Sequence, residues 1–170
     1  MARAAGPDRS LEVLQRPPGA VAEGQFLAAC TRCDACSDAC PPKAIRIADN
    51  TFGPRREGTP YIDAAIQACV MCEDTPCIQA CEPGVLRHEL PVRMALVQVH
   101  EGGCLAWQGE PCIVCADACP VEGAITHDPG SRPRIDESHC TGCGTCLQVC
   151  PVGSDGIHLE PAPTRPFHPL

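Results

Sequence analysis

The stretch from Cys140 to Pro151 reads CTGCGTCLQVCP, and the rest of the chain is best interpreted outward from it. Cys140, Cys143 and Cys146 follow one another at two-residue gaps, and Cys150 follows after three more residues. This spacing is typical of thiolate ligands to a [4Fe–4S] cluster. Two-residue gaps require the backbone to wrap tightly, and the intervening glycines tolerate the positive φ angles that such wrapping needs. The stretch therefore predicts an iron–sulfur site.

The same pattern of cysteines occurs three more times along the chain. The run that begins at Cys30 repeats the spacing unchanged, whereas the runs that begin at Cys69 and Cys104 each contain one longer gap. All sixteen cysteines are used, four to a run, which predicts four [4Fe–4S] clusters. The predicted ligands are Cys30, Cys33, Cys36, Cys40, Cys69, Cys72, Cys77, Cys81, Cys104, Cys112, Cys115, Cys119, Cys140, Cys143, Cys146 and Cys150.

The fourth cysteine of a run in a two-cluster protein ligates the neighbouring cluster, so the runs are expected to work in pairs. Adjacent pairing joins the first run with the second and the third with the fourth, and the hairpin segments PYID (60–63) and PRID (133–136) favour it. Nested pairing joins the first run with the fourth and the second with the third. It is favoured by residues 69–81, CVMCEDTPCIQAC, which are similar to the second run of four-cluster subunits in molybdenum oxidoreductases. Both layouts stay open.

Zinc and disulfides explain the runs less well than clusters do. Zinc sites use pairs of cysteines separated by a longer gap, not three cysteines at successive two-residue gaps. Cysteines two residues apart rarely reach disulfide geometry, and disulfides need an oxidising compartment. Since the sixteen cysteines complete four clusters, His139 is interpreted as a group beside a cluster rather than a ligand, and Trp107 as a packing residue.

Composition supports a chain built around inorganic clusters. The chain has three Phe, one Tyr and one Trp, too few to fill an ordinary core, since aromatic side chains supply much of the buried area. The formal net charge is −8, and four oxidised clusters with their thiolates, at about −2 each, bring it to about −16. Nucleic acid is therefore a poor partner, and a basic docking face on another protein is a better one.

Short apolar segments flank the cysteine runs and predict a strand, cysteine loop, short helix and strand in each repeat. Glycine, proline and asparagine in residues 50–58 and 128–133 predict the turns between paired strands. The predicted fold class is α+β, with two bacterial 2[4Fe–4S] ferredoxin-like units in tandem, rich in loops and poor in regular secondary structure. The predicted strands lie within residues 44–48, 60–67, 85–88, 94–100, 124–127, 133–139 and 156–160.

The sequence divides into three predicted parts: an N-terminal arm over residues 1–25, a four-cluster region over 26–160, and an extended tail over 161–170. The first thirty residues contain no apolar run of signal-peptide length, and no stretch approaches the roughly 20 apolar residues that span a bilayer. No nucleophile with a base and no phosphate-binding loop is found. These features predict a cytoplasmic protein without a transmembrane segment that is not an enzyme.

Three stretches resemble the NapF family, ferredoxin-type accessory proteins of the periplasmic nitrate reductase system. They are RPPGAVAEGQFLAACTRCDAC (16–36), CLAWQGEPCIVCADAC (104–119) and RIDESHCTGCGTCLQVCP (134–151). The second run, CVMCEDTPCIQACEPG (69–84), resembles instead the NapG/MauM-type ferredoxins, which lie in an electron path from quinol to nitrate reductase and carry an export signal.

The NapF resemblance implies a cytoplasmic four-cluster protein that binds the catalytic molybdenum subunit of nitrate reductase before export and assists its maturation. The alternative is an electron-transfer subunit whose clusters form a wire in a membrane-associated or molybdenum oxidoreductase complex, with another redox protein as partner. Both hypotheses use the same sixteen cysteines, and they differ in whether the protein binds a precursor or conducts electrons.

Overall fold

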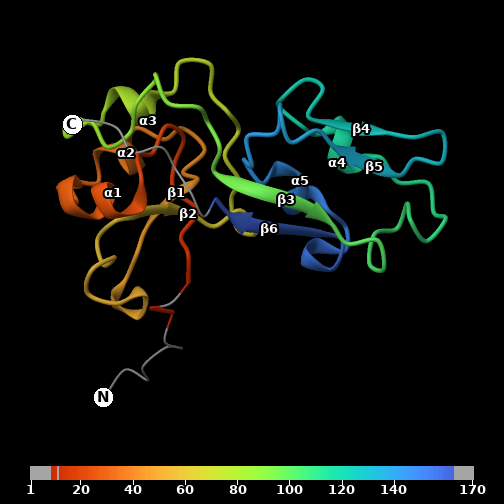
Figure 1. Ribbon diagram of the computed structural model, residues 1–170, viewed down its shortest axis with the longest axis horizontal. Helices are drawn as coiled ribbons and strands as arrows, with labels where there is room; N and C mark the ends of the chain where they lie inside the picture. The colour runs from red at the N-terminus through yellow and green to blue at the C-terminus, as the bar shows by residue number, and fades with distance from the viewer. Residues whose placement is uncertain (1–8, 11, 163–170) are drawn as a thin grey trace.

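The computed structural model describes residues 9–10 and 12–162, in which short helices and two-stranded sheets are joined by long loops (Figure 1). No helix among these residues is long and apolar enough to cross a membrane. The elements in chain order are α1 (Glu23–Ala29), α2 (Ala35–Asp38), β1 (Ile45–Ile47), η1 (Asn50–Phe52), β2 (Pro60–Ile62), α3 (Pro76–Gln79), β3 (Ala95–Val99), α4 (Val114–Asp117), β4 (Ile125–His127), β5 (Pro133–Ile135), α5 (Thr145–Val149), η2 (Gly153–Asp155) and β6 (Ile157–Pro161).

Two units follow each other along the chain, and Figure 1 shows them side by side. In the C-terminal unit (residues 95–161), the outer strands β3 and β6 pair antiparallel and the inner strands β4 and β5 form a hairpin. In the N-terminal unit (residues 20–86), β1 and β2 form the corresponding inner hairpin, with Ile45 opposite Ile62. The helices that follow the cysteine loops pack in pairs, α2 with α3 and α4 with α5. Both units therefore arrange two adjacent cysteine runs around one hairpin.

Six of the seven predicted strand segments contain a strand, and both predicted turns join hairpin strands. The exception is residues 85–88, where the structure has a single bridge between Ala20 and Leu86. The pairing stops there because Pro18 has no N–H to donate and Gly19, at φ 71°, turns the chain away. The outer strand pair of the N-terminal unit is thus reduced to one bridge.

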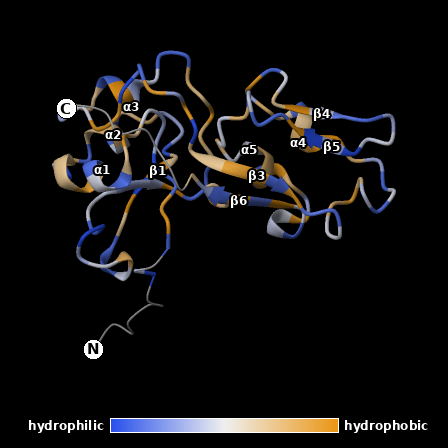
Figure 2. Cartoon of the chain, in the orientation of Figure 1, coloured by the Kyte–Doolittle hydropathy of each residue, from blue (hydrophilic) through white to orange (hydrophobic). Residues whose placement is uncertain are grey.

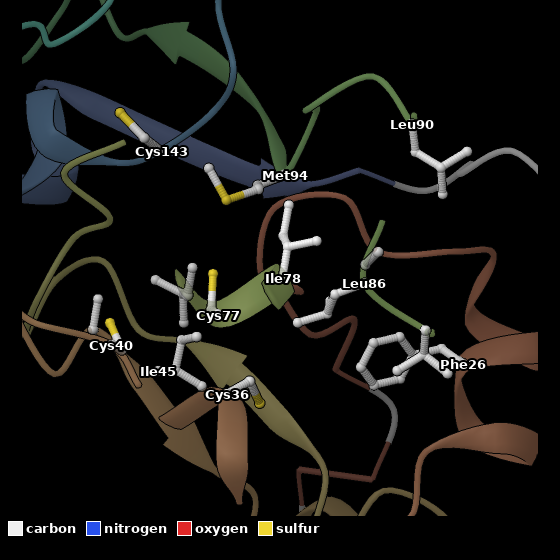
Figure 3. Close-up of a cluster of buried hydrophobic side chains, with 14 of the residues drawn as sticks. Phe26, Cys36, Cys40, Ile45, Cys77, Ile78, Leu86, Leu90, Met94 and Cys143 are labelled. Atoms are coloured by element: carbon white, nitrogen blue, oxygen red, sulfur yellow. The ribbon is translucent and has the colours of Figure 1, made fainter. Parts of the chain in front are cut away.

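The main core contains cysteine sulfur in place of much of the aromatic area of an ordinary core (Figure 3). Cys36, Cys40 and Cys77 are buried among aliphatic side chains such as Ile45 and Ile78. Apolar and polar residues alternate over short distances along the chain, as Figure 2 shows. Packing in this core therefore depends directly on what the thiols hold.

The division into arm, four-cluster region and tail stays a prediction, and within the predicted N-terminal arm over residues 1–25 the structure shows residues 14–21 buried within the N-terminal unit. Prolines and glycine in this segment suggest an extended linker from sequence, yet the extended chain lies against the fold rather than in solvent. Of the predicted tail over 161–170, Pro161 ends β6 and Ala162 is buried. Residues 1–8, 11 and 163–170 lie outside the described part of the chain.

Arg16 anchors this buried segment, since its side chain is fully buried. The guanidinium pairs with Glu23 at 2.6 Å and donates hydrogen bonds to the Thr59 hydroxyl at 2.8 Å and the Pro60 carbonyl at 2.7 Å. It also lies over the Phe26 ring at 4.6 Å. A buried charge is tolerated only when it is paired in this way.

Arg16→Ala is therefore expected to lower the free energy of unfolding by about 3 kcal/mol, because it leaves buried polar groups unpaired and opens a cavity beside Phe26. The control is Arg134→Ala, whose side chain is 67% exposed and 3.8 Å from Asp128, and which should change it by less than about 1 kcal/mol. Denaturant unfolding of the cluster-loaded protein under anaerobic conditions measures both. Equal effects would show that Arg16 does not anchor the segment.

Candidate iron–sulfur centres

The two-residue loops between cysteines in the first, second and fourth runs contain left-handed backbone, whereas the loop between Cys112 and Cys115 in the third run does not. In the fourth run Gly142 and Gly144 have φ angles of 67° and 91°, as the sequence predicts. In the first run the corresponding residues are Arg32 and Asp34, at 56° and 61°, and Met71 in the second run has 54°. The wrapped conformation therefore does not require glycine, although residues with a Cβ adopt it at a cost of roughly 1–2 kcal/mol each.

The N-terminal unit brings its eight cysteines together in two sets of four, each around its own cavity. The first three cysteines of one run join the fourth of the other, so the runs exchange their last thiol. Set A consists of Cys30, Cys33, Cys36 and Cys81. Set B consists of Cys40, Cys69, Cys72 and Cys77.

The C-terminal unit repeats the exchange between its two runs. The thiols of set D line one cavity, and the thiols of set C interact electrostatically with one another. Set C consists of Cys119, Cys140, Cys143 and Cys146. Set D consists of Cys104, Cys112, Cys115 and Cys150. This arrangement shows that the first run pairs with the second and the third with the fourth, and it excludes the nested layout.

The buried thiols become thiolates readily only with a positively charged metal centre beside them. Burial, together with repulsion from neighbouring thiolates, raises the pKa of Cys36, Cys69 and Cys146 to about 12. Cys33 is the exposed exception, and hydrogen bonds, chiefly from the Ala35 N–H, lower its pKa. Four thiolates this close together are unfavourable without a cation, and the iron of a [4Fe–4S] cluster supplies that charge. The donor sets therefore fit the predicted clusters.

Single metal ions fit these sets less well. In the ranges that the structure describes, no three His, Cys, Asp or Glu side chains gather around one metal position. Sets A, B and D each line a cavity instead, as a cluster with four separate iron corners needs. His139 pairs with Asp136 at 2.9 Å, and Arg132 lies over the Trp107 ring at 5.1 Å. Both residues thus have partners outside the cysteine sets, in agreement with their interpretation from sequence.

The four sets form one row. Cys36 of set A interacts electrostatically with Cys77 of set B, and Cys146 of set C with Cys115 of set D. Between the units, Cys69 of set B interacts with Cys143 of set C. These neighbours give the order A, B, C, D, which passes from the N-terminal unit into the C-terminal unit.

Comparison with known proteins agrees with this geometry. The 4Fe-4S dicluster domain profile matches the chain twice, over residues 29–85 and 95–154. The chain belongs to this 4Fe-4S dicluster family. Each match contains two adjacent cysteine runs, as each structural unit does. The ferredoxin-type chain therefore carries two dicluster domains, whose sixteen cysteines fit four [4Fe–4S] clusters.

Several ferredoxin-type proteins are similar to this chain over most of its length. The methylamine utilization ferredoxin-type protein MauM of Methylorubrum extorquens is 38% identical, over 86% of this chain and 72% of that protein. The ferredoxin-type protein NapG of Escherichia coli is 38% identical, over 90% and 73%. NapF of Escherichia coli is 31% identical, over 82% and 81%.

These comparisons confirm the resemblance to ferredoxin-type proteins of the Nap and Mau systems, and they favour NapG and MauM over NapF. The second run, which resembles NapG and MauM, agrees with this result, whereas the other three stretches resemble NapF. The relatives are electron carriers and not enzymes, so this chain is a ferredoxin-type electron-transfer protein.

The exchange of the fourth thiol predicts which double variants share a cluster. Cys33→Ala with Cys81→Ala removes two thiols from set A and should leave about 12 irons per chain. Cys33→Ala with Cys40→Ala removes one thiol from each of two sets and should leave about 8, although both residues belong to one run. Iron and acid-labile sulfide analysis of anaerobically purified protein measures this. The reverse order of iron contents would show that each run holds its own cluster.

Cluster retention should also depend on pH. The raised pKa values of Cys36, Cys69 and Cys146 mean that these thiols are protonated at neutral pH in the absence of metal, whereas ligands are thiolates. Binding therefore releases protons, and affinity should rise with pH by up to about tenfold per unit for each proton released. Competition with an iron chelator in slightly acidic and slightly alkaline buffers measures this. Iron loss that does not increase in acid would contradict the assignment.

Proposed function

We propose that this ferredoxin-type protein is an electron relay that accepts electrons from one redox protein at one end and delivers them to another at the far end. Each [4Fe–4S] cluster, when bound, takes up and gives up one electron. The observation that carries the proposal is the unbroken row of cysteine sets through both units. A protein that only bound a partner would not need four sets in electrostatic contact from end to end.

The finer assignment extends the similarity to NapG and MauM. Each unit is proposed to be a bacterial two-cluster ferredoxin fold, with all sixteen cysteines as cluster ligands. The proposed partners are redox proteins of a nitrate reductase or methylamine-oxidising system. The formal charge of −8, made more negative by the clusters, favours partners with a basic docking face.

The second candidate is the maturation accessory of a nitrate reductase, which binds the catalytic molybdenum subunit before export. It is supported by NapF, because this chain covers 81% of the length of that relative. Because residues 14–21 are buried, this part of the N-terminal segment is not available as a free docking arm. A maturation role would therefore depend on the surface of the two units.

One experiment in the host separates the two functions. A strain without this chain is complemented with the wild type or with Cys112→Ala/Cys115→Ala, which lacks two thiols of set D. The relay predicts that the partner enzyme loses activity with its physiological donor and keeps activity with a small-molecule reductant. The maturation role predicts loss of activity with both reductants in the strain without the chain.

The controls use the same strains. Iron analysis verifies that the set D variant keeps about 12 irons, so a general loss of folding is detected separately. Full activity of this variant with the physiological donor would contradict the relay. The cytoplasmic location expected from the sequence stays a prediction, and fractionation of the complemented host tests it.

A further inference from the structure

The two units meet at a contact between a cysteine of set B and a cysteine of set C. The Cys69 N–H donates a hydrogen bond to the Cys143 carbonyl at 3.2 Å, although the two residues belong to different units. Ala68, directly before Cys69, is fully buried at this contact. The backbone of residues that carry the thiols therefore takes part directly in the contact between the units.

Gln148 holds this contact from the C-terminal unit. Its side-chain Oε1 accepts a hydrogen bond from the Ala68 N–H at 3.1 Å, and its Nε2 donates to the Ile66 carbonyl at 3.3 Å. One amide thus pairs with two backbone groups of the opposite unit, in the way that a neighbouring strand would. We call these two hydrogen bonds the Gln148 clamp. Since Ala68 precedes Cys69, the clamp fixes the backbone that leads into set B.

Two further side chains form hydrogen bonds at the same interface. The Thr145 hydroxyl, between Cys143 and Cys146 of set C, donates to the Cys69 carbonyl at 3.3 Å. The buried Gln15 amide donates to the Gly142 carbonyl at 2.8 Å and so ties the N-terminal segment to the loop of set C. The cysteine loop of set B is thus hydrogen-bonded to the C-terminal unit, and the cysteine loop of set C is hydrogen-bonded to the N-terminal part of the chain.

The interface also excludes any larger side chain at its centre. A Cβ at position 144 would overlap the Cβ of Ala64 in the other unit. The φ angle of Gly144 is 91°, so this glycine serves both the wrapping of its own loop and the close approach of the units. One residue therefore couples cluster binding to the docking of the units.

We propose that Gln148 and Thr145 are positioning residues that set the separation of sets B and C, and that electrons cross between the two units at the Cys69–Cys143 contact. This inference rests on the proposed relay. In the crossing, one electron leaves the reduced centre of one set and reaches the oxidised centre of the other. No bond forms or breaks and no proton moves. The rate then depends on how firmly the junction holds the two loops together.

The test uses Gln148→Met, which keeps the length of the side chain and removes both hydrogen bonds to the other unit. The matched control is Gln108→Met, because the Gln108 amide also donates to a backbone carbonyl, that of Glu101 at 2.9 Å, but within the C-terminal unit. Both variants are purified anaerobically with their clusters, and iron analysis should give about 16 irons for each.

Two readouts are expected to change in Gln148→Met alone. Hydrogen exchange of the Ala68 amide should become at least about fivefold faster, because its acceptor is lost. The magnetic coupling between reduced centres of different units, seen as splitting in electron paramagnetic resonance spectra, should weaken. Unchanged exchange and unchanged splitting in Gln148→Met, or equal changes in Gln108→Met, would overturn the positioning role.

The outcome separates this inference from the proposed function. If the host experiment contradicts the relay while Ala68 exchange and the splitting change, the clamp stands as a structural device and the electron crossing is wrong. If the relay holds and neither readout changes, electrons travel through the row but Gln148 does not position it. Each combination of results therefore decides one of the two claims.

Discussion

The structure depends on holding sixteen thiols in a small volume, in sets whose members repel one another once they ionise. Burial raises the pKa of thiols such as Cys36 and Cys146 to about 12, so the chain alone does not favour four thiolates together. Iron offsets this cost with its positive charge. Cluster binding and folding are therefore parts of one free-energy balance, as in other small metal-dependent folds.

This constraint explains the sparse secondary structure. The chain has five aromatic residues, and its longest helix in the described ranges, α1, has seven residues, so packing between regular elements contributes less than in most domains. The cysteine loops take over that role, with left-handed residues at Arg32, Asp34 and Met71 that would be unfavourable in isolation. Buried polar anchors such as Arg16 then fix the extended segments around them.

The exchange of the fourth thiol has a consequence for electron transfer. Because each run contributes to two sets, the two sets of a unit cannot move apart without breaking the backbone connection between them. No cysteine run contributes to sets in both units, and hydrogen bonds from Gln148, Thr145 and Gln15 join the units there instead. Between the units, the separation of the sets therefore depends on hydrogen bonds, one of them between the backbones of Cys69 and Cys143.

The spacing of the cysteines predicted the cofactor and the four runs, and apolar segments with turn residues predicted most strands, because these patterns act over a few neighbouring positions. Tertiary structure alone decided the pairing of the runs, since adjacent and nested layouts place the same ligands at the same local spacing. It also decided that residues 14–21 are buried, because a proline-containing extended segment has the same sequence pattern in solvent and against a core. The Gln148 clamp could not be predicted from the sequence for a related reason. It joins residues about 80 positions apart, and no local pattern marks a hydrogen bond across that separation.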